Sequence, residues 1–299
     1  MGLQSGLRRA VGFIGLGAMG SPMARNLVTA GFPLVVYDMD PKAVEPFAPL
    51  GAMIASSPKD LANDSRVIIT ILPSSSSLRE VLYGKDGLLP VLGSQHTFIE
   101  MSTLDVATTL EFSNEIQARG ARFLDCPVSG TPEIVERRDA EILSSGDQVA
   151  LKECSDILSA LSKRVVYAGK VGNGKAMKLC TNLLIGLNKL ALAESITLAL
   201  KLGLEPDVIL ECINGSNARS AVSERYGLAT ITGKEKISKK HSWQRKDLSL
   251  VVETAKQNST RLVLGELAKK ITEEASISVG GSDDYESIRR YYRNLMKLD

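Results

Sequence analysis

The chain has 299 residues, of which 44% are hydrophobic and 23% charged, a balance typical of a globular protein with a sizeable core. This length favours two domains, on a scale of roughly 100–200 residues each. The 36 basic and 34 acidic residues leave a net charge of only +2, which gives no electrostatic case for a nucleic-acid partner or a membrane surface.

The segment from residue 10 to residue 37 predicts a strand, a helix and a second strand. Ala10–Ile14 is a short apolar run that ends in glycine, which is the pattern of a buried strand. Helical spacing follows over Pro22–Thr29 and stops at the C-cap signal Ala30-Gly31. Phe32–Tyr37 is a second apolar run. Together these elements form a βαβ unit, and such units build parallel sheets.

The alternation of strands and helices continues to about residue 170. Further strands are predicted at Val67–Leu72, Thr97–Glu100, from Phe123–Leu124, Ala140–Ser144 and Val165–Tyr167. Helices are predicted at Pro41–Leu50, Pro58–Asn63, Ser77–Tyr83, Val106–Arg119 and Gln148–Leu161. Residues 1–170 are therefore expected to form one doubly wound α/β domain of the Rossmann type.

The pattern changes after a glycine-rich boundary at Gly169–Gly174. Helical periodicity runs from Gly174 to about Leu202, and no clear strand follows. Later segments also favour helix, at 206–214, 221–230, 246–257 and 260–275. We therefore expect residues 171–299 to form an all-helical domain that is entered by one long helix.

Cysteine and histidine usage bears on metals and on the cellular compartment. The chain has two histidines, and its four cysteines are far apart with no C-x-x-C pair; they are Cys126, Cys154, Cys180 and Cys212. This inventory disfavours a structural zinc site, so no metal is expected. Reduced thiols are expected for all four cysteines, which predicts a cytoplasmic protein. No unbroken apolar run reaches the ~20 residues that span a bilayer.

A glycine loop, Gly15-x-Gly17-x-x-Gly20, follows the first predicted strand and opens the first predicted helix. In a dinucleotide-binding loop the first glycine permits a tight turn, the second leaves room for the pyrophosphate, and the third lets the helix pack close to the strand. The helix N-terminus then offers free N–H groups to the phosphates. We expect the loop, with Ala18 and Met19 inside it, to bind a dinucleotide; the alternative is a purely structural turn.

Asp38 ends the second predicted strand and bears on the choice of cofactor. A carboxylate there accepts hydrogen bonds from the ribose 2′-OH of NAD and repels the 2′-phosphate of NADP. The residues that follow, Met39 and Asp40, include no arginine to receive a phosphate. The sequence favours NAD over NADP, and the alternative is that Asp38 only caps the following turn.

Four blocks of sequence, in order, resemble the β-hydroxyacid dehydrogenase family. They are Gly12–Leu27, Asp125-Cys-Pro-Val-Ser-Gly130, Gly172-x-Gly174-x-x-x-Lys178-x-x-x-Asn182 and Lys246-Asp-Leu-Ser-Leu250. This family includes 3-hydroxyisobutyrate dehydrogenases, tartronate semialdehyde reductases and succinic semialdehyde/glyoxylate reductases. The resemblance implies an NAD(P)-dependent oxidoreductase for a small 3-hydroxy acid or the matching semialdehyde. It also implies a 6-phosphogluconate dehydrogenase-like C-terminal domain and a homodimer or homotetramer.

Lys178 and Asn182 are the catalytic residues that the resemblance implies, with Lys178 as general acid and base. Because they are four residues apart on a predicted helix, they share a face and could hold one hydroxyl oxygen between them. The alternative is that Lys178 is an ordinary solvated helix charge. Catalysis by Lys178 in the oxidative direction needs a neutral amine. Two nearby positive charges are candidates for favouring that form, the neighbouring Lys175 and the oxidised nicotinamide.

The substrate carboxylate is expected at the turn Ser129–Thr131, whose N–H and hydroxyl groups would receive it, as the resemblance implies for Ser129, Gly130 and Thr131. Many family members have a second glycine in place of Thr131. Lys246 is expected to reach the substrate or the cofactor. Trp243 is a candidate for lining the pocket, with plain packing as the alternative.

Two further segments resemble cofactor contacts of the family. Ser102 and Thr103 resemble its nicotinamide-contacting pair, and Leu72 and Pro73 resemble its loop beside the adenine and ribose. The charged stretch Glu136–Glu141 departs from the family pattern. Its two arginines, at 137 and 138, either meet an acidic substrate or form a solvated loop.

Several other functions are alternatives to this one. A non-catalytic nucleotide-binding homologue and an imine reductase share the architecture but lack the catalytic lysine, whereas Lys178 and Asn182 are both present here. A 6-phosphogluconate dehydrogenase is usually longer and carries a phosphate site. A transcriptional or scaffold protein is a further alternative, which a test for dehydrogenase activity would separate.

Overall fold

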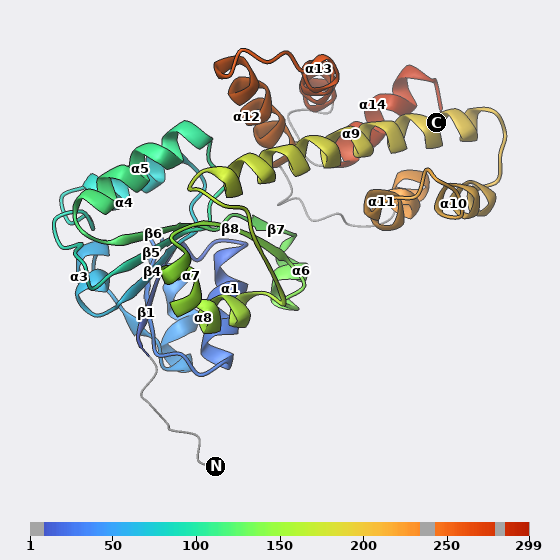
Figure 1. Cartoon of the computed structure of the whole chain (residues 1–299). Helices are drawn as coiled ribbons and strands as arrows, with labels where there is room; N and C mark the ends of the chain where they lie inside the picture. Colours follow the sequence, from blue (N-terminus) through green and yellow to red (C-terminus); the bar gives the residue numbers. More distant parts are fainter. Residues whose placement is uncertain (1–8, 234–242, 279–284, 299) are drawn as a thin grey trace. The chain divides into compact units, whose positions relative to one another are not determined.

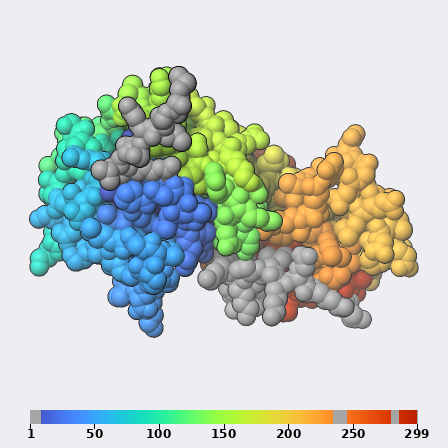
Figure 2. Space-filling model, turned by 90° about the horizontal axis from the view of Figure 1, so that it is seen from below, coloured from blue at the N-terminus to red at the C-terminus, as the bar shows by residue number. Residues whose placement is uncertain are grey.

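The computed structural model describes residues 9–233, 243–278 and 285–298. The chain divides into two compact units, Met1–Lys178 and Leu179–Asp299. Figure 2 shows the surface of both units, with the first coloured from blue to green and the second from yellow to red. The boundary expected from the sequence lies just before the long helix, whereas the division into units falls inside that helix. The first turns of the helix therefore belong with the sheet.

A single sheet of nine strands forms the centre of the first unit, within the residues that the structure describes. The strands are β1 (Val11–Ile14), β2 (Leu34–Tyr37), β3 (Met53–Ile54), β4 (Val67–Thr70), β5 (Thr97–Glu100), β6 (Arg122–Asp125), β7 (Val128–Ser129), β8 (Glu141–Gly146) and β9 (Arg164–Tyr167). Their order is β3-β2-β1-β4-β5-β6-β8-β7, and β9 pairs with β8. From β3 to β6 all pairs are parallel. The doubly wound fold expected from the sequence is confirmed.

The sheet departs from a purely parallel pattern at β8. This strand runs antiparallel to both β6 and β7, while β9 returns parallel to β8. Sheets that are otherwise parallel often carry such antiparallel strands toward an edge. The sequence pattern does not reveal the reversal, because apolar periodicity reports burial and not strand direction.

Helices cover both faces of this sheet (Figure 1). They are α1 (Gly20–Thr29), α2 (Pro41–Val44), α3 (Pro58–Asn63), α4 (Ser75–Tyr83), α5 (Val106–Ala118), α6 (Pro132–Glu136), α7 (Gln148–Glu153) and α8 (Ser155–Leu161), with a 3₁₀ helix at Glu45–Leu50. Neighbouring residues of one strand serve opposite faces, because side chains alternate along a strand. Phe13 packs with α1 and α8 in one cluster, while Ile14 packs with α3, α4 and α5 in the other.

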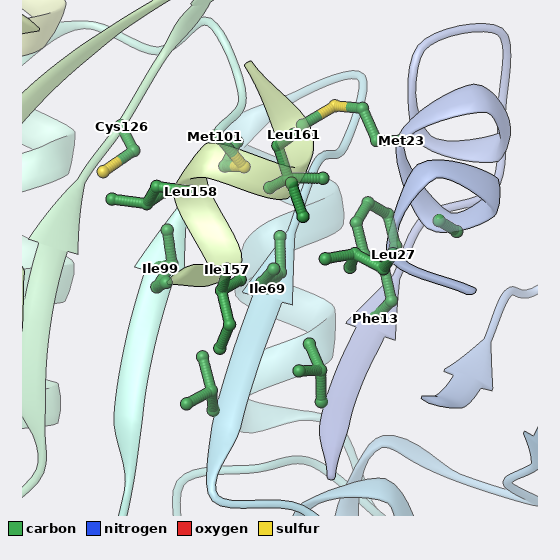
Figure 3. Close-up of a cluster of buried hydrophobic side chains, with 14 of the residues drawn as sticks. Phe13, Met23, Leu27, Ile69, Ile99, Met101, Cys126, Ile157, Leu158 and Leu161 are labelled. Atoms are coloured by element: carbon green, nitrogen blue, oxygen red, sulfur yellow. The ribbon is translucent and has the colours of Figure 1, made fainter. Parts of the chain in front are cut away.

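Figure 3 shows the first of these clusters, where Phe13 and Ile69 of the sheet meet Leu27 of α1 and Ile157 of α8. All four side chains are fully buried. Full burial of such a side chain stabilises the fold by about 1.5–3 kcal/mol relative to leaving it exposed. The core therefore fixes where strands β1 and β4 end, and with them the loops at their carboxyl ends.

Two helices predicted as continuous are broken in the structure. The helix expected at Pro41–Leu50 is a short α-helix followed by a 3₁₀ helix, because Pro46 and Pro49 cannot donate backbone hydrogen bonds. The helix expected at Gln148–Leu161 is interrupted at Cys154, where φ is −98° and ψ is 9°. Four elements were missed entirely: the two-residue strands β3 and β7, the five-residue α6, and α14 (Tyr285–Leu295).

The second unit is helical in the described residues. Its elements are the rest of α9 (Asn173–Lys201), then α10 (Pro206–Asn214), α11 (Ala221–Thr232), α12 (Trp243–Gln257), α13 (Val263–Ser278) and α14. Their core includes Ile196, Tyr226, Leu248 and Tyr285. Gly186 of α9 permits the close approach of α12, since a Cβ there would lie 2.9 Å from Leu248 Cδ2. The predicted helical character of this region is confirmed.

One described helix, α9, is long and apolar enough to cross a membrane by length and composition alone. Its most apolar 18-residue window has a mean hydropathy of 1.6. It contains no long unbroken apolar run, because polar residues interrupt it throughout. Its first turns carry Lys175, which is fully buried in ion pairs with the sheet of the first unit. The start of α9 is thus part of a folded domain.

Candidate active site

The glycine loop connects β1 to α1, and its three glycines meet three different requirements. Gly15 has a φ of +97°, and a Cβ there would overlap the carbonyl oxygen of Ile71. A Cβ at Gly20 would overlap the carbonyl of Gly15, so this glycine allows the helix to approach the strand. A Cβ at Gly17 would meet nothing within 4 Å, which leaves open space at the start of α1. Such a cradle fits a dinucleotide pyrophosphate.

Ala18 and Met19 complete the loop. Ala18 is partly exposed, while Met19 is 8% exposed and belongs to the core behind the loop. The side chain of Met19 is thus used in packing, which leaves its backbone as the part that a cofactor could contact.

Asp38 follows β2 directly and is tied to this loop. Its Oδ2 accepts a hydrogen bond from the N–H of Leu16 at 2.6 Å, and its Oδ1 accepts one from the N–H of Asp40 at 2.9 Å. The capping role that the sequence left open is therefore present, together with a bond to the glycine loop. Each carboxylate oxygen has a second lone pair, so Asp38 keeps the capacity to accept a ribose hydroxyl.

The two other predicted cofactor segments are joined by one hydrogen bond. Ser102 Oγ, in a side chain only 2% exposed, accepts from the N–H of Leu72 at 2.8 Å. The loop after β4, which continues into Pro73, thus contacts the loop after β5, which continues into Thr103. The carboxyl ends of neighbouring parallel strands meet at one edge of a sheet, which is where doubly wound proteins bind ligands.

Ser129, Gly130 and Thr131 lie at the end of β7 and the start of α6. A Cβ at Gly130 would lie 2.9 Å from Ala140 Cβ, so this part of the turn is closely packed. The Thr131 hydroxyl donates to Glu133 Oε2 at 2.7 Å, so its proton is already engaged. Ser129 and backbone N–H groups are then the donors that this turn offers to an anion.

Lys178 and Asn182 are both buried on α9, with exposures of 7% and 8%. Burial excludes the reading of Lys178 as an ordinary solvated helix charge, because lysine is almost never buried without a specific environment. Asn182 Nδ2 donates to Asp247 Oδ2 at 2.9 Å, a contact within the second unit. Sequence reasoning missed Asp247, although it directly follows Lys246 in the resemblance block.

Two predicted substrate residues lie on α12. Lys246 is exposed, one residue before Asp247. Trp243 begins the helix. Its side chain lies outside the described residues, and with it the prediction that Trp243 either lines the pocket or only packs.

The charged cluster Glu100, Asp125 and Lys175 is the main feature that sequence reasoning missed. Lys175 Nζ lies 2.6 Å from Glu100 Oε2 and 2.8 Å from Asp125 Oδ1, and all three side chains are at most 1% exposed. Burial raises the pKa of Glu100, and the ammonium of Lys175 partly offsets that effect. A signal was available, since Glu100 and Asp125 end the adjacent strands β5 and β6.

This cluster corrects the role expected for Lys175. The sequence suggested that Lys175 acts on Lys178 as a neighbouring positive charge. Instead its ammonium is compensated by two buried carboxylates, and together they keep the pKa of Lys175 above its usual value despite the opposing effect of burial. Lys175 is therefore not an uncompensated cation beside Lys178.

The two arginines of the charged stretch are used locally. Arg137 Nε donates to the carbonyl of Glu133 at 3.2 Å, and the guanidinium of Arg138 donates to the carbonyl of Ser159. These contacts favour a charged surface loop over contact of the two arginines with an acidic substrate. Among the described residues, no group of three His, Cys, Asp or Glu side chains is arranged to hold a metal ion.

Comparison with known proteins gives matches along nearly the whole chain. Residues 10–169 match the family model of the NAD binding domain of 6-phosphogluconate dehydrogenase. Residues 172–292 match the model of the NAD-binding domain of NADP-dependent 3-hydroxyisobutyrate dehydrogenase. The two models meet at the start of α9.

Individual relatives agree with these models. The chain is 32% identical to human mitochondrial 3-hydroxyisobutyrate dehydrogenase, over 95% of this chain and 86% of the relative. It is 30% identical to the chloroplastic glyoxylate/succinic semialdehyde reductase 2 of Arabidopsis thaliana, over 94% and 75%. A crystal structure of 3-hydroxyisobutyrate dehydrogenase from Salmonella typhimurium superimposes with a TM-score of 0.81 at 25% identity, covering 94% and 99%. The chain belongs to the β-hydroxyacid dehydrogenase family and is an oxidoreductase that uses a nicotinamide cofactor on a CH–OH group.

Proposed function

We propose that this enzyme oxidises a small 3-hydroxy acid, or reduces the matching semialdehyde, with Lys178 as general acid and base. The observation that carries the proposal is the burial of both Lys178 and Asn182, four residues apart on α9. A buried lysine beside a buried amide, at helical spacing, offers two polar groups to one oxygen atom.

Each polar group has a task in this reaction. Lys178 accepts the proton of the substrate hydroxyl during oxidation and returns it to the carbonyl oxygen during reduction. One N–H of the Asn182 amide is held by Asp247, and the other is available to the same substrate oxygen. Ser129 and the backbone N–H groups of the following turn receive the carboxylate. The bound nicotinamide supplies the hydride acceptor for oxidation and the hydride donor for reduction.

NAD is the proposed cofactor, with NADP as the less favoured one. Asp38 supports NAD, because its half-buried carboxylate ends β2 and is fixed to the glycine loop through Leu16. A negative charge held rigidly at this point disfavours a 2′-phosphate, since the carboxylate would have to move or take a proton to admit it. The proposed contacts at Leu72, Pro73, Ser102 and Thr103 do not discriminate between the two cofactors.

A panel of 3-hydroxy acids, tested separately with NAD and NADP, examines the proposal directly. At least one acid is expected to reduce NAD, as measured by absorbance of the product. Lys178→Met is expected to lower kcat by about 10²–10⁴-fold, the usual contribution of a general acid or base. Its dissociation constant for NADH is expected to stay within about threefold, since it is not a proposed cofactor contact.

Lys201→Met is the matched control on the same helix. Lys201 ends α9 and its Nζ donates to the carbonyl of Lys297, so its loss is expected to leave kcat unchanged. The proposal fails if Lys178→Met keeps more than a tenth of the wild-type kcat. Turnover of imines in place of hydroxy acids would favour an imine reductase. NADH binding without any turnover would favour a non-catalytic homologue.

We also infer a homodimer or homotetramer in the cytoplasm. Large apolar side chains of the second unit are exposed, among them Leu184 at 60%, Leu264 at 62% and Ile277 at 79%. Exposed apolar surface of this kind favours association.

The four cysteines are free, which suits a reducing compartment. Light scattering on a size-exclusion column and cell fractionation test these two inferences, and a monomer or an organellar protein would overturn them.

A further inference from the structure

A buried ion cluster occupies the carboxyl edge of the sheet. Lys175 contacts the carboxylates of Glu100 at 2.6 Å and Asp125 at 2.8 Å, and its Nζ also donates to the carbonyl of Glu100 at 3.3 Å. Removing three charges from water is costly, and apolar side chains of similar volume often stabilise a fold as well or better. A gain in stability therefore does not explain the cluster, whereas a role in holding nearby groups in a fixed geometry does.

On one side, the cluster leads to the proposed nicotinamide loop. The Oε1 of Glu100 accepts the N–H of Ser102 at 2.9 Å, while Oε2 faces Lys175. Ser102 Oγ in turn accepts the N–H of Leu72 at 2.8 Å. Three successive contacts thus run from the ammonium of Lys175 to the loops after β5 and β4. A shift of the Glu100 carboxylate would move the Ser102 backbone with it.

On the other side, the cluster fixes the start of α9. The Oδ2 of Asp125 accepts the N–H groups of Gly172 and Lys175 at 3.2 Å, and the hydroxyl of Ser145 at 2.9 Å. Asp125 thereby holds both the backbone and the side chain of Lys175. Lys178 lies three residues farther along the same helix, and both residues lie within the first unit. The rotation and axial position of this first turn decide where Lys178 lies.

We propose that Lys175 is a positioning residue for the dehydrogenase reaction. Its ammonium joins the carboxylates at the ends of β5 and β6, and so fixes the Ser102 loop relative to the first turn of α9. The inference rests on the proposed function in one respect, namely that Lys178 exchanges the substrate proton. Lys175 itself touches neither substrate nor cofactor in this scheme. An ion cluster suits the task because each contact has a defined direction and length, unlike an apolar contact.

Lys175→Met, which keeps the length of the side chain and removes its charge, tests the proposal. The matched control is Leu161→Ala, a buried substitution in α8 of the same unit at a position that is not among the proposed site residues. Both variants are assayed well below their melting temperatures. Lys175→Met is expected to lower kcat by about 10–100-fold, because a misplacement near 1 Å costs up to ~10²-fold. Leu161→Ala is expected to lose stability and keep the wild-type kcat.

A second readout separates positioning from folding and does not need turnover. The emission yield of enzyme-bound NADH reports the surroundings of the nicotinamide beside Ser102. With NADH saturating, Lys175→Met is expected to change this yield, whereas Leu161→Ala is expected to leave it unchanged. If Lys175→Met does not fold, Lys175→Gln replaces it, since its amide can still donate to both carboxylates; the same changes are expected, to a smaller extent.

The outcomes are distinguishable from failure of the proposed function. Wild-type kcat and emission yield in a folded Lys175 variant overturn the positioning role, whatever Lys178→Met does. If the wild type turns over no acid of the panel, or if Lys178→Met remains fully active, the proposed function fails. In that case the emission yield alone decides, and an unchanged yield overturns the role of Lys175 in fixing the Ser102 loop.

Discussion

The two units of the chain treat their buried polar groups in opposite ways. The first unit buries full charges, in Glu100, Asp125 and Lys175, at the carboxyl edge of its sheet. The second unit mostly buries neutral hydroxyls whose protons go to carbonyls one turn earlier, as in Thr197 and Thr272. Hydroxyls satisfied within their own helix stabilise it locally, whereas charges that link several elements hold loops in register. The first unit therefore fixes geometry through buried charges that link several elements, whereas these buried hydroxyls of the second unit stabilise their own helices.

The largest expected effect comes from breaking the charged cluster. Asp125→Ala is expected to lower the free energy of unfolding by about 3–5 kcal/mol, because it leaves Lys175 with a single buried partner. Thr272→Val in the second unit is expected to cost only about 1 kcal/mol, the net value of one hydrogen bond. Urea unfolding of both variants measures the difference. Equal losses would abolish the distinction between the two units.

The loss of folding stability at alkaline pH extends the comparison to a buried group of the second unit. Burial raises the pKa of Tyr285 to about 12, from an ordinary value of 10.0. A raised folded pKa means stability that is complete below pH 10 and is lost as the pH rises toward 12. A shift of this size corresponds to roughly 2–3 kcal/mol. The loss is measured by unfolding at a series of pH values.

Tyr285→Phe isolates this contribution. The variant loses the hydrogen bond between the hydroxyls of Tyr285 and Thr230, which lowers stability at neutral pH by about 1 kcal/mol. Its stability is expected to fall less steeply than that of the wild type between pH 10 and pH 12. Parallel slopes for Tyr285→Phe and the wild type would contradict the assignment.

Cofactor choice tests whether the first unit alone sets specificity. Asp38→Asn is expected to raise the ratio of kcat/KM with NADP to that with NAD by about 10–100-fold, equivalent to roughly 1.4–2.8 kcal/mol. The physical reason is the loss of a negative charge beside the 2′-position of the ribose. Asp40→Asn, an exposed neighbour, is the control. An unchanged ratio in Asp38→Asn would restrict Asp38 to its hydrogen bonds with Leu16 and Asp40.

The smallest expected effect concerns the accessibility of the cysteines to a thiol reagent, which also differs between the two units. Both cysteines of the first unit are buried, and burial raises the pKa of Cys126 to about 12 and that of Cys154 to about 11. Both cysteines of the second unit, Cys180 and Cys212, are exposed. A thiol reagent at pH 8 is expected to label only the exposed pair in the native protein and all four in denaturant. Peptide mass analysis identifies the labelled sites, and native labelling of Cys126 would contradict the buried assignment.

Most of the first unit could be predicted from the sequence, because its strands are short apolar runs bounded by glycine, proline or aspartate. Thr97–Glu100 and Pro58–Asn63 have the same bounds in the sequence analysis and in the structure. The missed strands β3 and β7 have two residues each, too few for periodicity to appear. In α14 the buried positions Tyr285, Ile288 and Tyr292 have helical spacing, but charged residues between them obscured the pattern.

By itself, the sequence determined the glycine loop, the ordering of strands and helices, and the four blocks that mark the family. These are local features, set by residue type and spacing. Only the tertiary structure brought Lys175 of α9 between the carboxylates that end β5 and β6, since contacts at sequence separations of 50 and 75 residues leave no periodic signal. Likewise, the same four-residue spacing describes a solvated or a buried pair, and packing alone decided that Lys178 and Asn182 are buried.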